Sequence, residues 1–322
     1  MKVAVVQTLW VEDPAEGLQN AFRAVEEVCA GGDVDVVCFP EFFLGPPWYM
    51  PGQDHLRGRT DTPIPGRIVD GFRELARGLR TNVLLGSIVE DLRDGMYRNT
   101  SLFIDRQGVV ADSAIKAHAF GNEMVVCRQA ESLGVMTTEF GLVGVAVCSD
   151  FWIPEVIRLL AVAGARTIFV PGGTLLQNQS LMVNALSSAA YLNDVNIVYA
   201  SSVGVVRGKR GDRLVEVRFA GTSLVTGPEG VIAQAGTDEP EVLVVDLDPD
   251  GADPGDAGSP PGDGRRWIGM RRPQAYGALL GDYVGARRDL AAELRTAIAP
   301  TGGADGRDRG AGPTDSGERT GS

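Results

Sequence analysis

Histidine is almost absent from this chain, which contains only His55 and His118. Neither residue lies in a context typical of a cysteine–histidine hydrolase, so a carboxylate has to be considered as the base of any nucleophile. The four cysteines show neither CxxC spacing nor the density of a disulfide-rich scaffold. We therefore expect reduced thiols, a cytoplasmic location, and neither a metal nor another cofactor.

Excess positive charge and long apolar runs are also missing. The chain carries 42 acidic and 30 basic residues, a formal net charge of −12, which argues against a nucleic-acid partner. No apolar run approaches membrane-spanning length, and the start, MKVAVVQTLWVEDP, suits a first strand better than a secretion signal. With 44% hydrophobic residues, the 322-residue chain can bury a large core.

The first part of the chain alternates strand and helix patterns. Apolar runs predict strands at 3–8, 35–41 and 83–90. Between them, helical spacing behind Asp13-Pro14 predicts a helix that ends at Gly31-Gly32, and a second helix covers 68–79. This order is typical of an α/β fold.

The remainder continues the alternation after one antiparallel hairpin. Apolar periodicity and turn residues predict these elements: a hairpin over 99–116, a loop near the site over 117–134, strands at 142–147, 167–170 and 196–203, a helix behind Pro154 and a helix over 179–193. Residues 214–248 are rich in strand signals and favour a sheet edge rather than a separate domain.

Composition divides the chain into a folded part and a tail. We expect one domain over 1–249 and a linker or mobile loop over 250–264, where Gly, Pro and Asp dominate. Residues 265–298 are expected to pack on the body or on a partner subunit. Residues 299–322 contain no large apolar side chain and are expected to be disordered.

Cys148 stands at the seam between the predicted strand 142–147 and the predicted helix behind Pro154. A thiol near the N-terminus of a helix is expected to favour the thiolate, because unpaired N–H groups and the helix dipole stabilise negative charge. This position makes Cys148 the candidate nucleophile.

A nucleophilic cysteine needs a base and a group that stabilises the oxyanion. Glu41 and Lys116 each follow a predicted strand, as Cys148 does. Because side chains at the carboxyl ends of strands in an open α/β sheet converge on one crevice, the pattern permits a Glu-Lys-Cys cluster.

Three short motifs resemble the signatures of the nitrilase superfamily of carbon–nitrogen hydrolases: FPE at 39–41, IKAH at 115–118 and CSD at 148–150. The separations of Glu41, Lys116 and Cys148, 116 − 41 = 75 and 148 − 116 = 32 residues, suit that family. Similar runs extend the resemblance over about residues 2–248: VAVVQ, YRNTSLFIDRQG, AGARTIFVPGG and FAGTSLVTGPEGVIA.

The resemblance implies a four-layer α-β-β-α sandwich with mixed sheets, assembled as a homodimer or larger homo-oligomer. It also implies that Glu41 is the base, that Cys148 forms an acyl-enzyme, and that Lys116 with the backbone N–H of Ser149 stabilises the oxyanion. Ser149 stands where relatives often carry an aromatic residue, so a less bulky pocket wall is expected.

The resemblance further implies a second glutamate that positions substrate and lysine, for which Glu123 is our candidate and Glu131 the alternative. Trp48, Tyr49 and Trp152 are candidates for the wall of a substrate pocket, although aromatic residues in loops equally serve packing. The predicted activity is hydrolysis of a small amide or N-carbamoyl compound. A nitrilase, an amide acyl transferase and a catalytically idle binding protein remain the alternatives.

Overall fold

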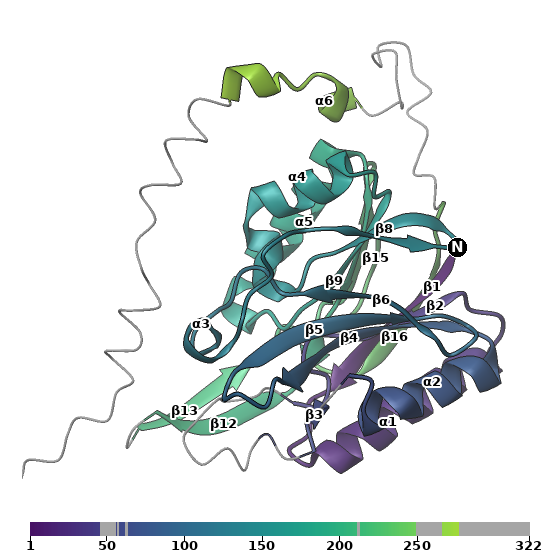
Figure 1. Ribbon diagram of the computed structural model, residues 1–322, viewed down its shortest axis with the longest axis vertical. Coiled ribbons are helices and arrows are strands. Elements are labelled where there is room, and N and C mark those ends of the chain that lie inside the picture. The colour runs from purple at the N-terminus through teal and green to yellow at the C-terminus, as the bar shows by residue number, and fades with distance from the viewer. Residues whose placement is uncertain (46–55, 57, 62–63, 211–212, 249–265, 277–322) are drawn as a thin grey trace, which may run out of the picture.

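The computed structural model describes residues 1–45, 56, 58–61, 64–210, 213–248 and 266–276 (Figure 1). Its helices are α1 (Pro14–Ala30), α2 (Arg67–Leu79), α3 (Glu123–Val126), α4 (Pro154–Val162), α5 (Gln179–Asn193) and α6 (Arg266–Gly269), with the 3₁₀ helices η2 (Cys148–Trp152) and η3 (Leu176–Asn178). The first strands are β1 (Lys2–Leu9), β2 (Val36–Cys38), β3 (Thr60–Asp61), β4 (Asn82–Asp91), β5 (Tyr97–Ile104), β6 (Val110–Ile115), β7 (Val135–Thr138) and β8 (Gly141–Val145). The others are β9 (Thr167–Pro171), β10 (Asn196–Ala200), β11 (Ser202–Val203), β12 (Val205–Arg210), β13 (Arg213–Arg218), β14 (Leu224–Gly227), β15 (Gly230–Gln234) and β16 (Glu241–Asp246).

Two mixed sheets form the centre of the molecule. The 8-stranded sheet has the order β11-β1-β2-β4-β5-β6, with β16 beside β1 and β3 beside β4. The 6-stranded sheet has the order β15-β14-β10-β9-β8-β7. In each sheet a parallel core, β1-β2-β4 or β8-β9-β10, is extended by antiparallel strands.

Helices cover the outer face of each sheet. α1 and α2 lie on the 8-stranded sheet, whereas α4 and α5 lie on the 6-stranded sheet (Figure 1). Strand β1 shows the consequence, since Ala4 and Val6 pack toward the helices while Val3 and Val5 pack toward the other sheet. A strand covered on both faces reads as a continuous apolar run. The predicted four-layer α-β-β-α sandwich is therefore confirmed.

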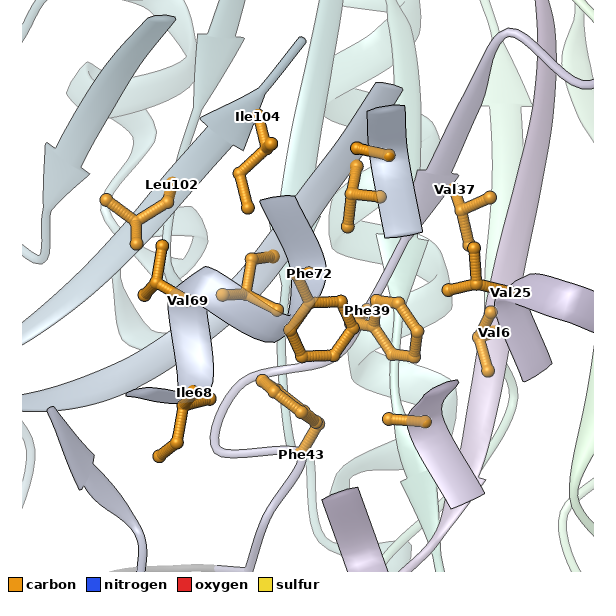
Figure 2. Packing of buried hydrophobic residues seen from close by; sticks show 14 of the residues in the cluster. Val6, Val25, Val37, Phe39, Phe43, Ile68, Val69, Phe72, Leu102 and Ile104 are labelled. Atoms are coloured by element: carbon orange, nitrogen blue, oxygen red, sulfur yellow. The ribbon is translucent and has the colours of Figure 1, made fainter. Parts of the chain in front are cut away.

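A cluster of aromatic rings under α1 and α2 fixes the chain just before Glu41 (Figure 2). The ring of Phe39 lies 5.3 Å from that of Phe43 and 5.6 Å from that of Phe72, measured between centroids. Each such fully buried side chain stabilises the fold by roughly 1.5–3 kcal/mol. Packing against α1 and α2 consequently fixes the end of β2.

The ends of the first helices follow their sequence signals. Asp13 accepts a hydrogen bond from the N–H of Ala15 at 2.9 Å, and Gly31 closes α1, both as predicted. At the start of α2, the buried carboxylate of Asp61 accepts the N–H groups of Ile68 at 3.0 Å and Val69 at 2.9 Å. A side-chain acceptor at this point satisfies N–H groups that have no partner within the helix.

Residues 214–248 do not form a single sheet edge, and in this respect the prediction is wrong. β15 ends the 6-stranded sheet, whereas β16 pairs with β1 in the 8-stranded sheet. β12 and β13 form a separate two-stranded hairpin. The periodicity of a strand does not show which of two stacked sheets it joins, because either sheet offers an apolar face.

Only part of the predicted C-terminal segment lies within the described residues. There, the ring of Trp267 on α6 lies 6.0 Å from that of Tyr191, and Ile268 packs on the core beneath α4 and α5. The predicted linker 250–264 and tail 299–322 lie outside the described residues. None of the described helices has the length and apolar character needed to cross a membrane.

Candidate active site

Glu41 is positioned by a close approach between two strands. Its backbone pairs with Ser87 on β4, next to Gly86. A Cβ atom on Gly86 would lie 1.9 Å from the carbonyl oxygen of Pro40, so only glycine allows the chain to pass at this distance. β4 thus determines where the Glu41 carboxylate enters the site.

Lys116 immediately follows β6 and is almost fully buried. Its backbone N–H donates to the carbonyl of Asn99 on β5 at 2.9 Å. Its Nζ donates to Glu41 Oε1 at 2.8 Å and to Glu123 Oε2 at 2.7 Å. With a side chain only 4% exposed, the ammonium depends on these carboxylates for compensation.

The structure brings Glu123, and not Glu131, to the lysine. Glu123 opens α3, and its Oε2 also accepts the N–H of Phe120 at 2.9 Å. Glu131 is exposed. The predicted loop 117–134 thus contains the short helix α3, which presents Glu123 seven residues after Lys116.

Cys148 begins η2 in a backbone conformation that is rare for residues other than glycine, with φ at +48°. Its thiol forms hydrogen bonds with the Glu41 carboxylate and with the backbone of Gly173. Glu41 therefore contacts both the lysine and the thiol, and the three predicted residues lie together.

The resting thiol is not poised as a thiolate, contrary to the prediction from its helix N-terminal position. Burial, and then the negative charge of Glu41, raise the pKa of Cys148 well above its usual range, although Lys116 opposes them. The hydrogen bond that Glu41 forms with the thiol acts in the same direction as its charge. Cys148 consequently needs a base to lose its proton.

Glu41 and Lys116 have shifted pKa values as well. Burial raises the pKa of Glu41, with the positive charge of Lys116 opposing this rise. Burial alone would lower the pKa of Lys116, but the charges of Glu41 and Glu123 outweigh it and raise that pKa well above its usual range. The lysine therefore remains a cation, and a carboxyl group with a raised pKa is suited to exchange protons with a thiol.

Asp150, the last residue of the CSD motif, is a structural centre of the site for which the sequence predicted no role. Its carboxylate accepts the N–H groups of His118 at 2.8 Å, Ala117 at 3.2 Å and Val147 at 3.1 Å. It also pairs with His118 Nδ1 at 2.9 Å. Asp150 thereby ties the residues after Lys116 to the residue before Cys148.

Ser149 lies between Cys148 and Asp150, and its hydroxyl donates to the carbonyl of His118. This bond adds a second tie between the chain after β6 and the start of η2. The small Ser149 side chain is thus hydrogen-bonded to the backbone, and the less bulky pocket wall at this position stays a prediction.

Phe219 lies next to Gly173, whose backbone contacts the thiol. A Cβ atom on Gly173 would lie 3.3 Å from Cε1 of Phe219 and 3.7 Å from Oε2 of Glu41. Next to Gly173, the hydroxyl of the buried Tyr199 donates to Thr174 Oγ1 at 2.9 Å, and burial raises the pKa of Tyr199 to about 12. Phe219 carries no recognisable chemical signal in the sequence.

The candidate pocket aromatics are only partly described. Trp48 and Tyr49 lie outside the described residues. Trp152 is half exposed, and its ring centroid lies 4.4 Å from that of Phe151. Among the described residues, no group of three or more His, Cys, Asp or Glu side chains has a geometry that could hold a metal ion.

Comparisons with known proteins agree with this fold. The chain is 27% identical over 251 residues to an (R)-stereoselective amidase of Pseudomonas sp., covering 77% of this chain and 86% of the relative. It is 26% identical over 264 residues to N-carbamoylputrescine amidase of Solanum lycopersicum, again covering 77% and 86%. The crystal structure of a Saccharomyces cerevisiae member of branch 10 of the nitrilase superfamily superposes with a TM-score of 0.66 at 27% identity, covering 78% of this chain and 90% of that chain.

The comparison with protein families extends over most of the chain. The sequence model for carbon–nitrogen hydrolases matches residues 2–254, which include both sheets and all of the residues gathered around Cys148. The chain therefore belongs to the carbon–nitrogen hydrolase family of the nitrilase superfamily.

Proposed function

We propose that the protein hydrolyses a non-peptide C–N bond in a small amide or N-carbamoyl compound through an acyl-enzyme on Cys148. The observation that supports this most directly is the position of Glu41, which contacts both the Cys148 thiol and Lys116. One carboxylate can then exchange protons with the nucleophile beside a fixed cation.

In the acylation step, Glu41 takes the thiol proton as the sulfur attacks the substrate carbonyl carbon. The carbonyl π electrons move to oxygen, and the oxyanion is stabilised by Lys116 Nζ and the backbone N–H of Ser149. The C–N bond then breaks, and Glu41 gives its proton to the departing nitrogen. Ammonia or an amine leaves, and a thioester remains on Cys148.

In the deacylation step, Glu41 takes a proton from water, and the resulting hydroxide attacks the thioester carbonyl. Collapse of the second oxyanion breaks the C–S bond, releases the acid and returns the proton from Glu41 to the sulfur. Because Lys116 is held by buried carboxylates, it meets each oxyanion without reorganisation. Removal of one such donor typically lowers kcat by roughly 10²–10³-fold.

The proposal of a small amide or carbamoyl substrate rests on the relatives. The two relatives described above are named as an amidase and as an N-carbamoylputrescine amidase. A panel of short amides, N-carbamoyl amines and nitriles, assayed for ammonia, tests the class. Turnover confined to nitriles would contradict the proposal, as would acyl transfer to amines without release of acid.

The thiol itself is tested by Cys148→Ala and Cys148→Ser, which we expect to abolish ammonia release from the substrate that the panel identifies. Cys29→Ala on α1 is the matched control, and we expect it to retain full activity. Intact-mass measurement of rapidly quenched wild-type enzyme should reveal the thioester. Undiminished turnover by Cys148→Ala would refute the mechanism.

A further inference from the structure

One buried amide contacts all the charged groups around Lys116. Asn99 lies on β5 and is 2% exposed. Its Nδ2 donates to Glu41 Oε1 at 2.9 Å and to Glu123 Oε1 at 2.9 Å. Its backbone carbonyl oxygen accepts the backbone N–H of Lys116 at 2.9 Å. Asn99 therefore holds the lysine by its backbone and both partners of the lysine by its side chain.

The orientation of the Asn99 amide follows from its neighbours. If the amide were reversed, its oxygen would face two carboxylate oxygens, which are acceptors only. With Nδ2 directed at the carboxylates, Oδ1 is buried and has no hydrogen-bond partner. A buried acceptor without a partner destabilises the fold. The unpaired Oδ1 is therefore an unfavourable contribution to stability that accompanies the placement of two N–H donors between Glu41 and Glu123.

The charge balance shows what these donors do. When Glu41, Glu123 and Lys116 are all ionised, the buried group has one negative charge in excess, and the two carboxylates repel each other. A hydrogen bond donated to a carboxylate favours its ionised form. The charged and titratable groups around the site come from different elements: Glu41 after β2, Lys116 after β6, Glu123 on α3, Cys148 on η2 and Tyr199 on β10.

We propose that Asn99 is a positioning residue that directs Glu41 and Glu123 at Lys116 and favours the ionised form of Glu41. It acts through these side chains and not on the substrate. The inference rests on the proposed function, since it assigns Asn99 to the preparation of the base for the thiol reaction. It goes further in predicting that an uncharged strand residue sets the acid limit of activity.

Asn99→Leu removes the donors and preserves the approximate size of the side chain, whereas Asn99→Asp adds a third carboxyl group. We expect kcat/KM at neutral pH to fall about tenfold or more in Asn99→Leu, and further in Asn99→Asp. We also expect the acid limb of the pH profile of kcat/KM to move upward by about one pH unit in Asn99→Leu, because the ionised carboxylates lose a donor. The shift should be larger in Asn99→Asp.

Asn82→Leu is the matched control. Asn82 is a buried asparagine in the same sheet, on β4, and its Nδ2 also donates to a carboxylate, Glu139 Oε1, at 2.8 Å. We expect this variant to lower stability and to leave the pH profile unchanged. A merely structural role for Asn99 would give the same result as the control, so superimposable profiles of Asn99→Leu and wild type would overturn the proposal.

A second measurement needs no substrate. In protein labelled with ¹³Cδ-glutamate, the carboxyl signals of Glu41 and Glu123 can be assigned by their loss in Glu41→Gln and Glu123→Gln and followed by NMR against pH. The apparent titration of this pair should move to higher pH in Asn99→Leu. An unmoved titration refutes the role of Asn99 whatever the activity. A moved titration together with turnover by Cys148→Ala refutes the proposed function and retains the role of Asn99.

Discussion

At the residue scale, the site depends on a carboxylate whose negative charge opposes ionisation of the neighbouring thiol. Glu41 raises the pKa of Cys148 by its charge and by its hydrogen bond, after the larger effect of burial. In the mechanism proposed above the same carboxylate removes the proton, so it would inhibit the resting thiol and activate it only during attack. A reaction of Cys148 that needs proton transfer should therefore respond differently to the loss of Glu41 than a reaction that needs only the thiolate.

Glu41→Gln is predicted to have opposite effects on two reactions. Turnover of the amide should be lost, because the leaving nitrogen receives no proton. Alkylation of Cys148 by iodoacetamide at neutral pH should become faster, because the removal of the negative charge lowers the pKa of the thiol while iodide leaves without a proton. Peptide mass spectrometry of alkylated Cys148 against time measures the second rate. Slower alkylation than in wild type would contradict the electrostatic assignment.

At the element scale, the distance between β2 and β4 sets the position of Glu41. Gly86 packs against the carbonyl of Pro40, and Glu41 pairs with Ser87 immediately beside it. From the other side, Asp150 ties the end of β6 to η2. The charged cluster is thus held by backbone contacts among β2, β4, β6 and η2.

Gly86→Ala is predicted to lower both stability and activity. The added Cβ would lie 1.9 Å from Pro40 O and must separate the strands, at a cost of about 1–3 kcal/mol. Gly78→Ala on α2 is the control, since its Cβ would meet nothing within 4 Å and alanine favours the helix by up to about 1 kcal/mol. Thermal unfolding and ammonia release measure the two effects. An equal Tm for both variants would show that β2 and β4 can separate without loss of stability, which would contradict the prediction.

At the scale of the whole molecule, the outer layer formed by α4 and α5 carries apolar side chains that a monomer leaves in water. The exposed apolar residues of this layer are Leu159 and Val162 on α4 and Leu181, Tyr191 and Leu192 on α5. Apolar side chains exposed on α4 and α5 would be removed from water if this layer met another apolar surface, which favours association. We propose that two copies of the chain associate through this layer, in line with the assembly that the family resemblance implies.

Light scattering is expected to give at least twice the mass of one chain. Leu181→Asp should shift the population toward monomer, because the carboxylate would be desolvated in the interface. Val109→Asp, which changes an exposed residue in the turn between β5 and β6, should leave the mass unchanged. A wild-type protein that is monomeric at micromolar concentration would rule out this interface.

The sequence by itself predicted the alternation of strands and helices, the limits of α1 and α5, and the identities of Glu41, Lys116 and Cys148. These features depend on local periodicity, on capping residues and on short motifs, all of which can be recognised in a single sequence. The same information did not separate Glu123 from Glu131, because only the direction of α3 brings one of them to the lysine. It also did not show that 214–248 supplies strands to both sheets.

Only the tertiary structure showed which groups shift the pKa of the thiol. Burial and the charge of Glu41 raise the pKa of Cys148, whereas a helix N-terminus alone predicts a lowered one. The contacts of Asn99 and Asp150 also became apparent only in the structure, since their side chains bind Glu41, Glu123 and His118, which lie 24 to 58 residues away along the chain. Electrostatic energies depend on distance and burial in space, and neither quantity is encoded by the local pattern of a sequence.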